Sequence, residues 1–122
     1  MSANILTVDD SASIRLTTRI ALTNAGYAVT EAVDGADGLG KLKTGSFDLI
    51  VTDLNMPNMD GLTMIRGLRQ LPAYMGTPVI FLTTESDGDL KLQAKAAGAT
   101  GWLTKPFDPE TLIKIVRKVL GR

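Results

Sequence analysis

Polar side chains follow four apolar runs in this sequence, each close to the point where the run ends. Asp9 and Asp10 come directly after NILTV, and Asp53 comes directly after LIVT. Thr83 follows VIFL, and Lys105 is the second residue after GWL. If these positions converge, the carboxylates repel one another, and a hard divalent cation such as Mg²⁺ relieves that repulsion through oxygen ligands. The set therefore predicts a magnesium site.

Phosphoryl transfer is the chemistry that these groups could support together. A carboxylate can act as the nucleophile and form an aspartyl-phosphate. A lysine ammonium and a metal ion can neutralise the phosphoryl oxygens, and this transfer depends mainly on alignment and charge neutralisation. Each residue alone has a plainer interpretation, because a single aspartate after a strand is usually a turn or capping residue. The joint occurrence of all of them favours the functional interpretation.

Short apolar segments alternate with longer segments of helical pattern, which predicts a parallel sheet covered by helices on both faces. The predicted strands are Asn4–Val8, Ala28–Glu31, Leu49–Thr52, Val79–Leu82 and Gly101–Leu103. The predicted helices are Ser11–Ala25, Gly35–Thr44, Gly61–Leu71, Asp87–Ala97 and Pro109–Leu120. Right-handed crossovers bring the carboxyl ends of all these strands to one edge of the sheet, where ligands of such folds bind.

Length and composition narrow the class of protein. At 122 residues the chain is expected to form one domain, spanning 1–122, with no effector domain. It contains no cysteine and no histidine, which excludes disulfides, zinc sites of the Cys/His type and histidine general bases. The 13 basic and 13 acidic residues cancel, which argues against a nucleic-acid partner. Without a signal peptide or an apolar run of about 20 residues, we expect a cytoplasmic monomer with no membrane contact.

The segments TVDDS, TDLNMPNMDG, LTTE and LTKPF together resemble the motif set of response-regulator receiver domains. The resemblance covers the whole chain in register, and NMPNMDG is especially similar to the CheY-like chemotaxis regulators. It implies a flavodoxin-like, doubly wound five-stranded sheet of order 2-1-3-4-5. It also implies a role for each motif residue. Asp53 would be the phosphorylated residue and Lys105 the phosphate-binding lysine. Asp10 would be a direct Mg²⁺ ligand, Asp9 an acidic neighbour acting largely through water, and Asn55 the donor of a backbone carbonyl to the metal; Thr83 would be the switch hydroxyl and Trp102 the aromatic switch position.

The resemblance further implies the partners and the output. The phosphodonor would be a histidine kinase of the CheA type, and the chain would be a signalling phosphoacceptor rather than a turnover enzyme. The target would be a protein such as a flagellar motor switch component, or there would be none if the protein is a phosphate sink. A cis peptide bond is implied at Lys105–Pro106. At Ser11, Lys91, Trp102 and Ile115 the chain departs from the enteric CheY pattern, which leaves the target open.

Three other functions compete with this interpretation. Gly35–Lys41 (GADGLGK) satisfies GxxxxGK, but Leu42 follows where a P-loop needs a serine or threonine for Mg²⁺. A phosphatase of the haloacid-dehalogenase type also uses an aspartyl-phosphate, but it needs a DxD motif that Asp9-Asp10-Ser11 does not supply. An inert pseudo-receiver would bind no Mg²⁺, and the complete set of site residues argues against it.

The first predicted helix carries a candidate docking site for the phosphodonor. A 100° step per residue places one stripe of this helix toward the sheet. That stripe consists of Ile14, Thr18, Ala21, Leu22 and Ala25. Leu16 and Ile20 then point roughly the opposite way, on a helix that begins next to Asp9-Asp10. An exposed apolar pair of this kind suits packing against a helix of the kinase, although single exposed apolar residues are also common.

Overall fold

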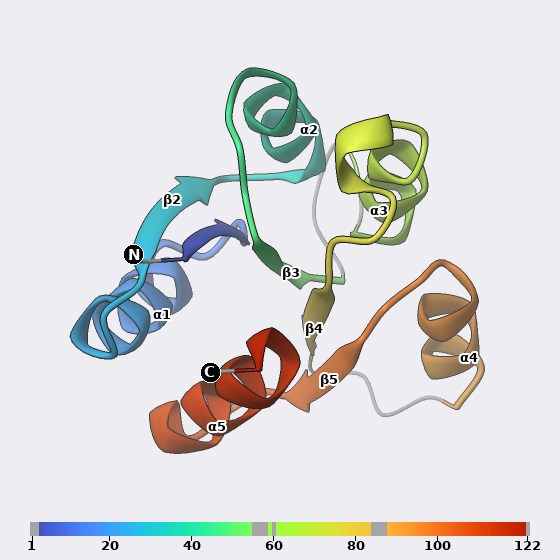
Figure 1. The fold of residues 1–122 in the computed structure, drawn as a ribbon. Helices are drawn as coiled ribbons and strands as arrows, with labels where there is room; N and C mark the ends of the chain where they lie inside the picture. Colours follow the sequence, from blue (N-terminus) through green and yellow to red (C-terminus); the bar gives the residue numbers. More distant parts are fainter. Residues whose placement is uncertain (1–2, 55–58, 60, 84–87, 122) are drawn as a thin grey trace.

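The computed structural model describes residues 3–54, 59, 61–83 and 88–121. Its centre is a five-stranded parallel sheet of order β2-β1-β3-β4-β5 (Figure 1). The strands are β1 (Asn4–Val8), β2 (Ala28–Ala32), β3 (Leu49–Asp53), β4 (Val79–Thr83) and β5 (Gly101–Thr104). This confirms the predicted fold class and strand order.

Helices cover both faces of the sheet. They are α1 (Ala12–Asn24), α2 (Gly35–Thr44), α3 (Gly61–Leu68), α4 (Gly88–Ala96) and α5 (Pro109–Leu120). In Figure 1, α1 and α5 lie side by side to the lower left of the sheet, and α2, α3 and α4 lie on its other side, toward the upper right and right. The crossovers follow from parallel pairing, since each strand must return to the same end of the sheet before the next one begins.

Two apolar clusters hold these layers together. One contains Leu6, Ile50, Phe81 and the buried side chains of α3, and the other contains Ile5, Val51, Leu82 and the inner faces of α1 and α5. Alternate residues of the central strands therefore point into opposite clusters, as the pleat requires. Every residue of β3 and β4 is buried, which explains why these segments are apolar almost throughout.

The observed boundaries differ from the predicted ones mainly at the ends of strands. β2, β3, β4 and β5 each continue one residue further than predicted, so that Asp53 and Thr83 are the last residues of β3 and β4. Asp53 pairs with Leu82, which shows that the ladder continues through the carboxylate position. Only the tertiary pairing supplies this extension, because a terminal polar residue breaks the apolar run without breaking the hydrogen bonds.

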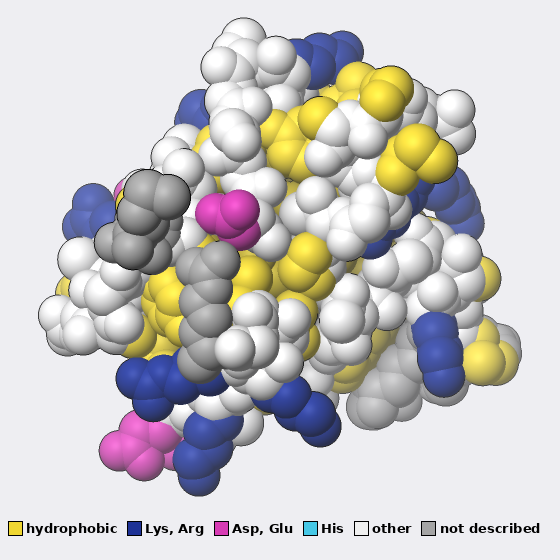
Figure 2. All heavy atoms as spheres, viewed as in Figure 1, with side chains coloured by type: hydrophobic (Ala, Val, Ile, Leu, Met, Phe, Trp, Pro, Cys, Tyr) yellow, Lys and Arg dark blue, Asp and Glu magenta, His cyan; other side chains and the backbone are white. Residues whose placement is uncertain are grey.

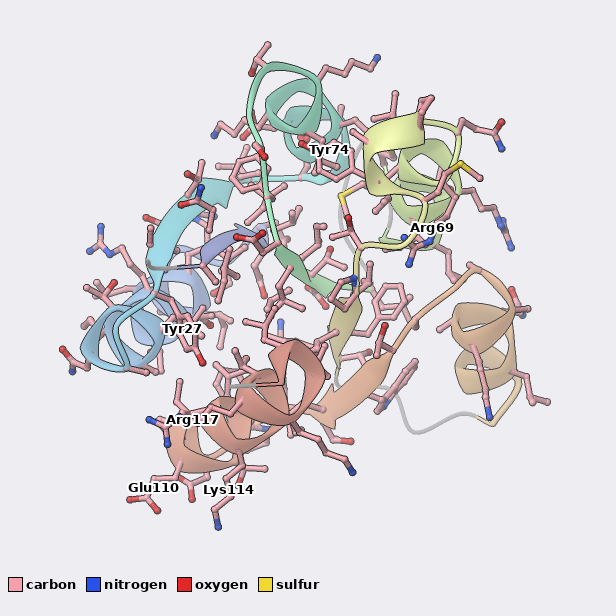
Figure 3. All side chains as sticks on the ribbon, in the orientation of Figure 1. Tyr27, Arg69, Tyr74, Glu110, Lys114 and Arg117 are labelled. Atoms are coloured by element: carbon pink, nitrogen blue, oxygen red, sulfur yellow. The ribbon has the colours of Figure 1, made fainter. Side chains whose placement is uncertain are left out.

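The predicted third helix is too long by three residues. α3 ends at Leu68, and a short 3₁₀ helix, η1, follows over Pro72–Tyr74. Pro72 forces the preceding residue, Leu71, out of the helical region, and Leu71 is extended with a ψ of 117°. The η1 segment is fixed by Arg69 and Tyr74, both labelled in Figure 3: Arg69 donates to the carbonyl oxygens of Tyr74 and Gly98 at 2.6 and 2.8 Å.

Tyr74 joins this turn to the end of α2. Its hydroxyl lies 2.7 Å from the carbonyl oxygens of both Leu42 and Gly45. Burial raises the pKa of Tyr74, so the hydroxyl keeps its proton and can donate it. The ends of α2, α3 and α4 are thereby joined through two side chains.

Two expectations about particular segments are settled by the backbone. The glycine-rich segment Gly35–Lys41 is helical throughout as part of α2, so it is not a phosphate-binding loop. The peptide bond Lys105–Pro106 is cis, as the resemblance implied.

None of the helices in the described part of the chain has the length and apolar content needed to cross a bilayer.

Candidate functional site

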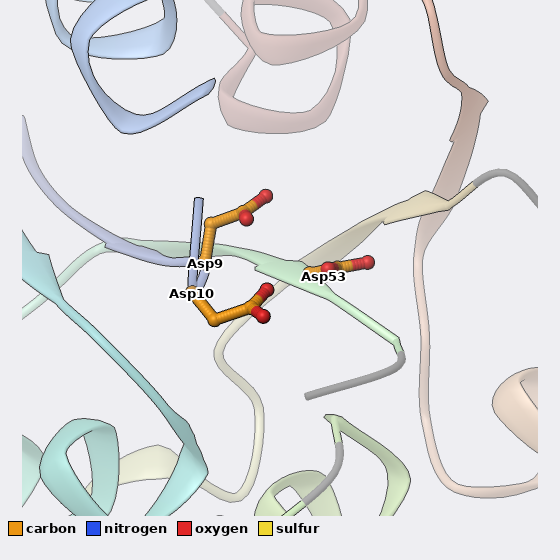
Figure 4. A group of neighbouring side chains, drawn as sticks. All are labelled: Asp9, Asp10 and Asp53. Atoms are coloured by element: carbon orange, nitrogen blue, oxygen red, sulfur yellow. The ribbon is translucent and has the colours of Figure 1, made fainter. Parts of the chain in front are cut away.

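Three carboxylates meet at the carboxyl edge of the sheet. Asp9 and Asp10 follow β1 directly, Asp53 ends β3, and β1 and β3 are neighbours in the sheet. One carboxylate oxygen of each residue lies within 4.8 Å of those of the other two, and Figure 4 shows the three side chains near one another with their carboxylates directed to the same side. Asp9 and Asp53 are 3% and 8% exposed, and Asp10 is exposed. The predicted convergence of these three residues is therefore observed.

Lys105 brings one positive charge into this cluster. Its ammonium nitrogen lies 2.7 Å from Asp9 Oδ2 and 3.4 Å from Asp53 Oδ2, and its side chain is only 11% exposed. Lys105 follows β5, so the contact joins the first strand of the chain to the last. The ammonium thus bridges two carboxylates rather than extending into solvent.

Asp9 already has partners on both carboxylate oxygens. The backbone N–H of Ser11 donates to Oδ1 at 2.9 Å, and Lys105 donates to Oδ2 at 2.7 Å. Asp53 is less fully engaged: Oδ1 accepts from the backbone N–H of Leu54 at 2.8 Å, and Oδ2 faces Lys105 at the longer distance. Within the described residues, no hydrogen bond or ion pair involves the carboxylate of Asp10.

Burial raises the pKa of Asp53 above its usual value of 3.8. The ammonium of Lys105 and the Leu54 N–H act in the opposite direction, and the charge of Asp9 adds to the increase. An ionised Asp53 is therefore costly in the protein even beside the Lys105 ammonium. A nearby cation lowers this cost, because an opposite charge favours the ionised form of a carboxyl group.

The described donors suit a hard divalent cation. Carboxylate oxygens are the ligands that Mg²⁺ prefers, usually one or two of them together with water and a substrate phosphate. Asp10 and Asp53 have free coordinating capacity, whereas both oxygens of Asp9 are engaged as described above. Asn55, expected to contribute a backbone carbonyl, lies outside the described residues.

The two expected switch residues lie on the strands next to Asp53. Thr83 is fully buried as the last residue of β4, and it pairs with Thr104 of β5. Trp102, in β5, is partly buried and packs against Phe81 with ring centroids 6.0 Å apart and planes tilted by 55°. Grooves of about 250 and 410 Å³ flank Trp102, the first beside α4 and the second beside α5.

Leu16 and Ile20 lie on the outer face of α1, as predicted. They are 45% and 50% exposed, whereas Thr18 and Leu22 on the opposite face are buried. Beside this face, a groove of about 450 Å³ separates the end of α1 from α5. Figure 3 labels Glu110, Lys114 and Arg117, which line it from α5, and Figure 2 shows apolar surface bordered by lysine and arginine side chains at the same lower left. No residue of the acidic cluster lines this groove.

Two further residues, which were not predicted from the sequence, support the acidic cluster. Gly61 begins α3 so close to the end of β3 that a Cβ atom there would collide with the carbonyl oxygen of Asp53. Arg15 donates to the carbonyl oxygen of Asp9 at 2.6 Å. The Asp60-Gly61 pair is a turn signal in the sequence, but no local pattern distinguishes Arg15 from Arg19, the other basic residue of α1.

Comparisons with known proteins agree with this geometry. Residues 5–117 match the response regulator receiver domain family. The chain is 36% identical over 119 residues to the chemotaxis protein CheY of Pseudomonas aeruginosa, covering 97% of this chain and 96% of that protein. The structure of the chemotaxis protein CheY4 of Vibrio cholerae superposes with a TM-score of 0.94 at 45% identity, covering 98% and 99% of the two chains.

A third relative carries a metal ion. It is the receiver domain of a sensor histidine kinase from Pseudomonas aeruginosa, which is 26% identical to this chain and has a TM-score of 0.91 over 100% of both chains. That structure has a magnesium ion coordinated in its active-site cleft.

Proposed function

The chain belongs to the response-regulator receiver domain family, and from this premise we propose that it accepts a phosphoryl group on Asp53 in a Mg²⁺-dependent reaction and alters a protein-binding face in response. The observation that carries the proposal is the arrangement around Asp53. Its carboxylate lies beside the Lys105 ammonium at 3.4 Å, and its oxygens lie within 4.8 Å of those of Asp9 and Asp10. This combination supplies a nucleophile, a cation for phosphoryl oxygens and carboxylate ligands for a metal.

Asp53 is the nucleophile in the proposed reaction. One of its carboxylate oxygens forms a bond to phosphorus while the bond from phosphorus to the histidine nitrogen of the donor breaks, and the released imidazole retains or takes up a proton. Lys105 neutralises charge on the phosphoryl oxygens, with its position fixed by the 2.7 Å ion pair to Asp9.

Asp10 and Asp53 would hold the metal ion, with support from Asp9 and the backbone carbonyl of Asn55. When bound, Mg²⁺ supplies charge neutralisation and alignment of the phosphoryl oxygens. The oxygen-only donor set and the relative that carries magnesium support this assignment. Because Asp9 already pairs with Lys105 and Ser11, we assign it a supporting position rather than direct ligation.

The phosphorylated state is proposed to act through Thr83 and Trp102. The Thr83 hydroxyl would move toward the phosphoryl oxygens, and Trp102 would repack inward. Trp102 lines both grooves beside β5, so its movement would reshape the surface formed by α4, β5 and α5. This surface is the proposed binding face for the target.

The receiver family implies a histidine kinase as phosphodonor and a protein as target. We assign the kinase to the CheA type and the pathway to chemotaxis, because relatives covering nearly the whole chain are chemotaxis proteins. The exposed pair Leu16 and Ile20 is the proposed kinase contact. A flagellar motor switch component and a phosphate sink without a target remain the two proposed outputs. Since such kinases use ATP, the cytoplasm is the proposed location.

A labelling experiment with a matched control variant tests whether Asp53 is the phosphoacceptor. The protein is incubated with a small phosphodonor and Mg²⁺, and the mass increase is measured on the intact chain. One phosphoryl group is expected on the wild-type protein and none on Asp53→Asn. Asp48→Asn is the control, because Asp48 lies at the opposite edge of the sheet, where it accepts from the Asn4 N–H. Labelling of Asp53→Asn at the wild-type level would refute the assignment.

The same preparation separates this proposal from its rivals. A phosphatase of the haloacid-dehalogenase type would release phosphate from generic esters through many rapid turnovers, whereas a phosphoacceptor incorporates one phosphoryl group per chain. An inert pseudo-receiver would bind no Mg²⁺ and incorporate nothing. The proposal therefore predicts stoichiometric labelling and no sustained ester hydrolysis.

A further inference from the structure

Every polar group of Asp9 has a partner, and one of these partners, Arg15, takes no part in the proposed phosphoryl transfer. The Asp9 N–H donates to the Ala32 carbonyl at 3.1 Å, and the two carboxylate oxygens bind Ser11 and Lys105. The remaining group, the Asp9 carbonyl, accepts from Arg15 Nη1 at 2.6 Å. Arg15 is thus the side chain that holds the peptide between Asp9 and Asp10.

Arg15 is itself held in place from the neighbouring strand. Its Nε lies 3.7 Å from Glu31 Oε1 on β2, and its side chain is 17% exposed. The other carboxylate oxygen of Glu31 pairs with Arg19 at 3.4 Å, and the Glu31 carbonyl accepts from Lys41 of α2. Glu31 is therefore fixed by three basic side chains, and it in turn orients the guanidinium of Arg15.

Asp10 is the residue that depends most on this arrangement. Its side chain is exposed, and among the described residues no hydrogen bond or ion pair restrains its carboxylate. The position of that carboxylate is set instead by the backbone that precedes it. Holding the Asp9 carbonyl fixes the plane of the Asp9–Asp10 peptide and hence the direction in which the Asp10 side chain leaves the chain.

We propose that Arg15 is a positioning residue for the metal site, acting through the Asp9–Asp10 peptide and anchored by Glu31. The inference rests on the proposed function, because it assumes that Asp10 binds Mg²⁺. Residues that orient metal ligands from outside the coordination sphere commonly change metal affinity by about 10- to 100-fold when they are replaced. We place Arg15 at the lower end of that range, because it orients Asp10 only through the backbone and leaves the Asp10 side chain able to rotate.

The sign of the effect separates positioning from charge. Arg15 is a cation close to a cation site, so its removal would tighten Mg²⁺ binding if only Coulomb repulsion mattered. If Arg15 positions Asp10, its removal weakens binding instead. The two mechanisms therefore predict opposite changes in the dissociation constant.

The test compares Arg15→Met with Arg19→Met. Methionine keeps an unbranched stem and removes every N–H donor, and Arg19 shares Glu31 without touching Asp9. We expect the Mg²⁺ dissociation constant from calorimetry to rise roughly tenfold in Arg15→Met and to stay the same or fall in Arg19→Met. Small-donor labelling of Arg15→Met is expected to approach the wild-type rate at saturating Mg²⁺, because Asp53 and Lys105 are intact. An unchanged or tighter dissociation constant in Arg15→Met would overturn the inference.

A second variant decides the matter if Arg15→Met does not fold. Arg15→Lys keeps the charge but has one ammonium in place of a guanidinium, so it cannot donate to the Asp9 carbonyl and pair with Glu31 in the same way. Positioning predicts weaker Mg²⁺ binding, and a pure charge effect predicts no change. If the wild-type protein binds no Mg²⁺, the proposed function fails. If the wild type binds Mg²⁺ while both Arg15 variants match it, only the role of Arg15 fails.

Discussion

At the scale of single residues, the site combines carboxylates that are unfavourable together without a cation. Asp9 and Asp53 are buried, Asp10 is close to both, and the Lys105 ammonium contacts Asp9 and Asp53. Sites with unbalanced charge often reduce stability in favour of function. Removal of one carboxylate should therefore have opposite effects on folding and on metal binding.

Replacement of Asp10 tests this opposition. Asp10→Ala removes one negative charge from the cluster and one proposed metal ligand. We expect the apo protein to gain stability, on the order of 0.5–1 kcal/mol in urea denaturation, and to lose measurable Mg²⁺ binding in calorimetry. Glu110→Ala, a change in an exposed acid in the first turn of α5, is the control: it should leave Mg²⁺ binding unchanged, and it should not raise stability, because an acid at a helix N-terminus is favourable. Retained metal affinity in Asp10→Ala would show that the ligand assignment is wrong.

The raised pKa of Asp53 predicts how stability depends on pH. Because burial raises this pKa in the folded state, the folded protein holds a proton that the unfolded chain releases above pH 3.8. Stability contributed by the protonated form is therefore present below pH 3.8 and is lost as pH rises through the folded pKa. Without Mg²⁺, Asp53→Asn should be more stable than the wild type at pH 7.

That advantage should shrink as the pH falls toward 3.8, where the wild-type carboxyl group also becomes neutral. Urea denaturation of both proteins in a chelating buffer, across this range, measures the difference directly. A stability difference that is independent of pH would contradict the role of desolvation.

At the scale of elements, α1 connects the acidic cluster to a surface that a partner can reach. It begins two residues after Asp10, with Ser11 as its N-cap, and its inner face is buried through Thr18 and Leu22. Leu16 and Ile20 lie on the outer face of the same helix. One helix therefore carries both a support for the metal site and the proposed kinase contact.

The double change Leu16→Ser/Ile20→Ser tests the contact. Both side chains are about half exposed, so stability should change little, whereas loss of apolar contact should slow phosphoryl transfer from the kinase by roughly tenfold. The measurement is the rate of transfer from the phosphorylated kinase, alongside labelling by a small donor. Val33→Ser, which changes an apolar residue that is 48% exposed outside α1, is the control. A parallel loss of small-donor labelling would instead indicate damage to the site.

At the scale of the whole molecule, the sheet joins the phosphoacceptor strand to the proposed output face. β3 carries Asp53, β4 carries Thr83 and β5 carries Trp102, and these strands are neighbours in this order. Only one strand, β4, therefore lies between the strand that carries Asp53 and β5. Since Trp102 is the only tryptophan, it reports on that path without interference.

Coupling across these strands is tested by fluorescence and binding together. Phosphorylation should change the emission of Trp102 in the wild type, because the ring would leave its partly exposed position for a more apolar one. Thr83→Ala should still be phosphorylated, but its fluorescence change should be reduced and its target binding weakened by roughly tenfold. Thr104→Ala, at the paired position on β5, is the control. Equal target affinity of Thr83→Ala and the wild type would argue against the coupling.

The sequence alone determined the class of fold and the membership of the acidic cluster. Alternating apolar and helical segments required a parallel sheet, and parallel strands require their carboxyl ends to share an edge. The positions of Asp9, Asp10, Asp53 and Lys105 followed from that rule without any knowledge of distances. The exposure of Leu16 and Ile20 followed in the same way from the helical period.

Tertiary structure decided which oxygen each charged group contacts. Lys105 pairs most closely with Asp9, 96 residues away, and this pairing leaves Asp53 and Asp10 as the freer carboxylates. The bond from Arg15 to the Asp9 carbonyl and the close approach of Gly61 to Asp53 were also decided there. The physical reason is that sequence patterns fix the direction of a side chain relative to its own element, whereas contacts depend on how separate elements pack to within an ångström.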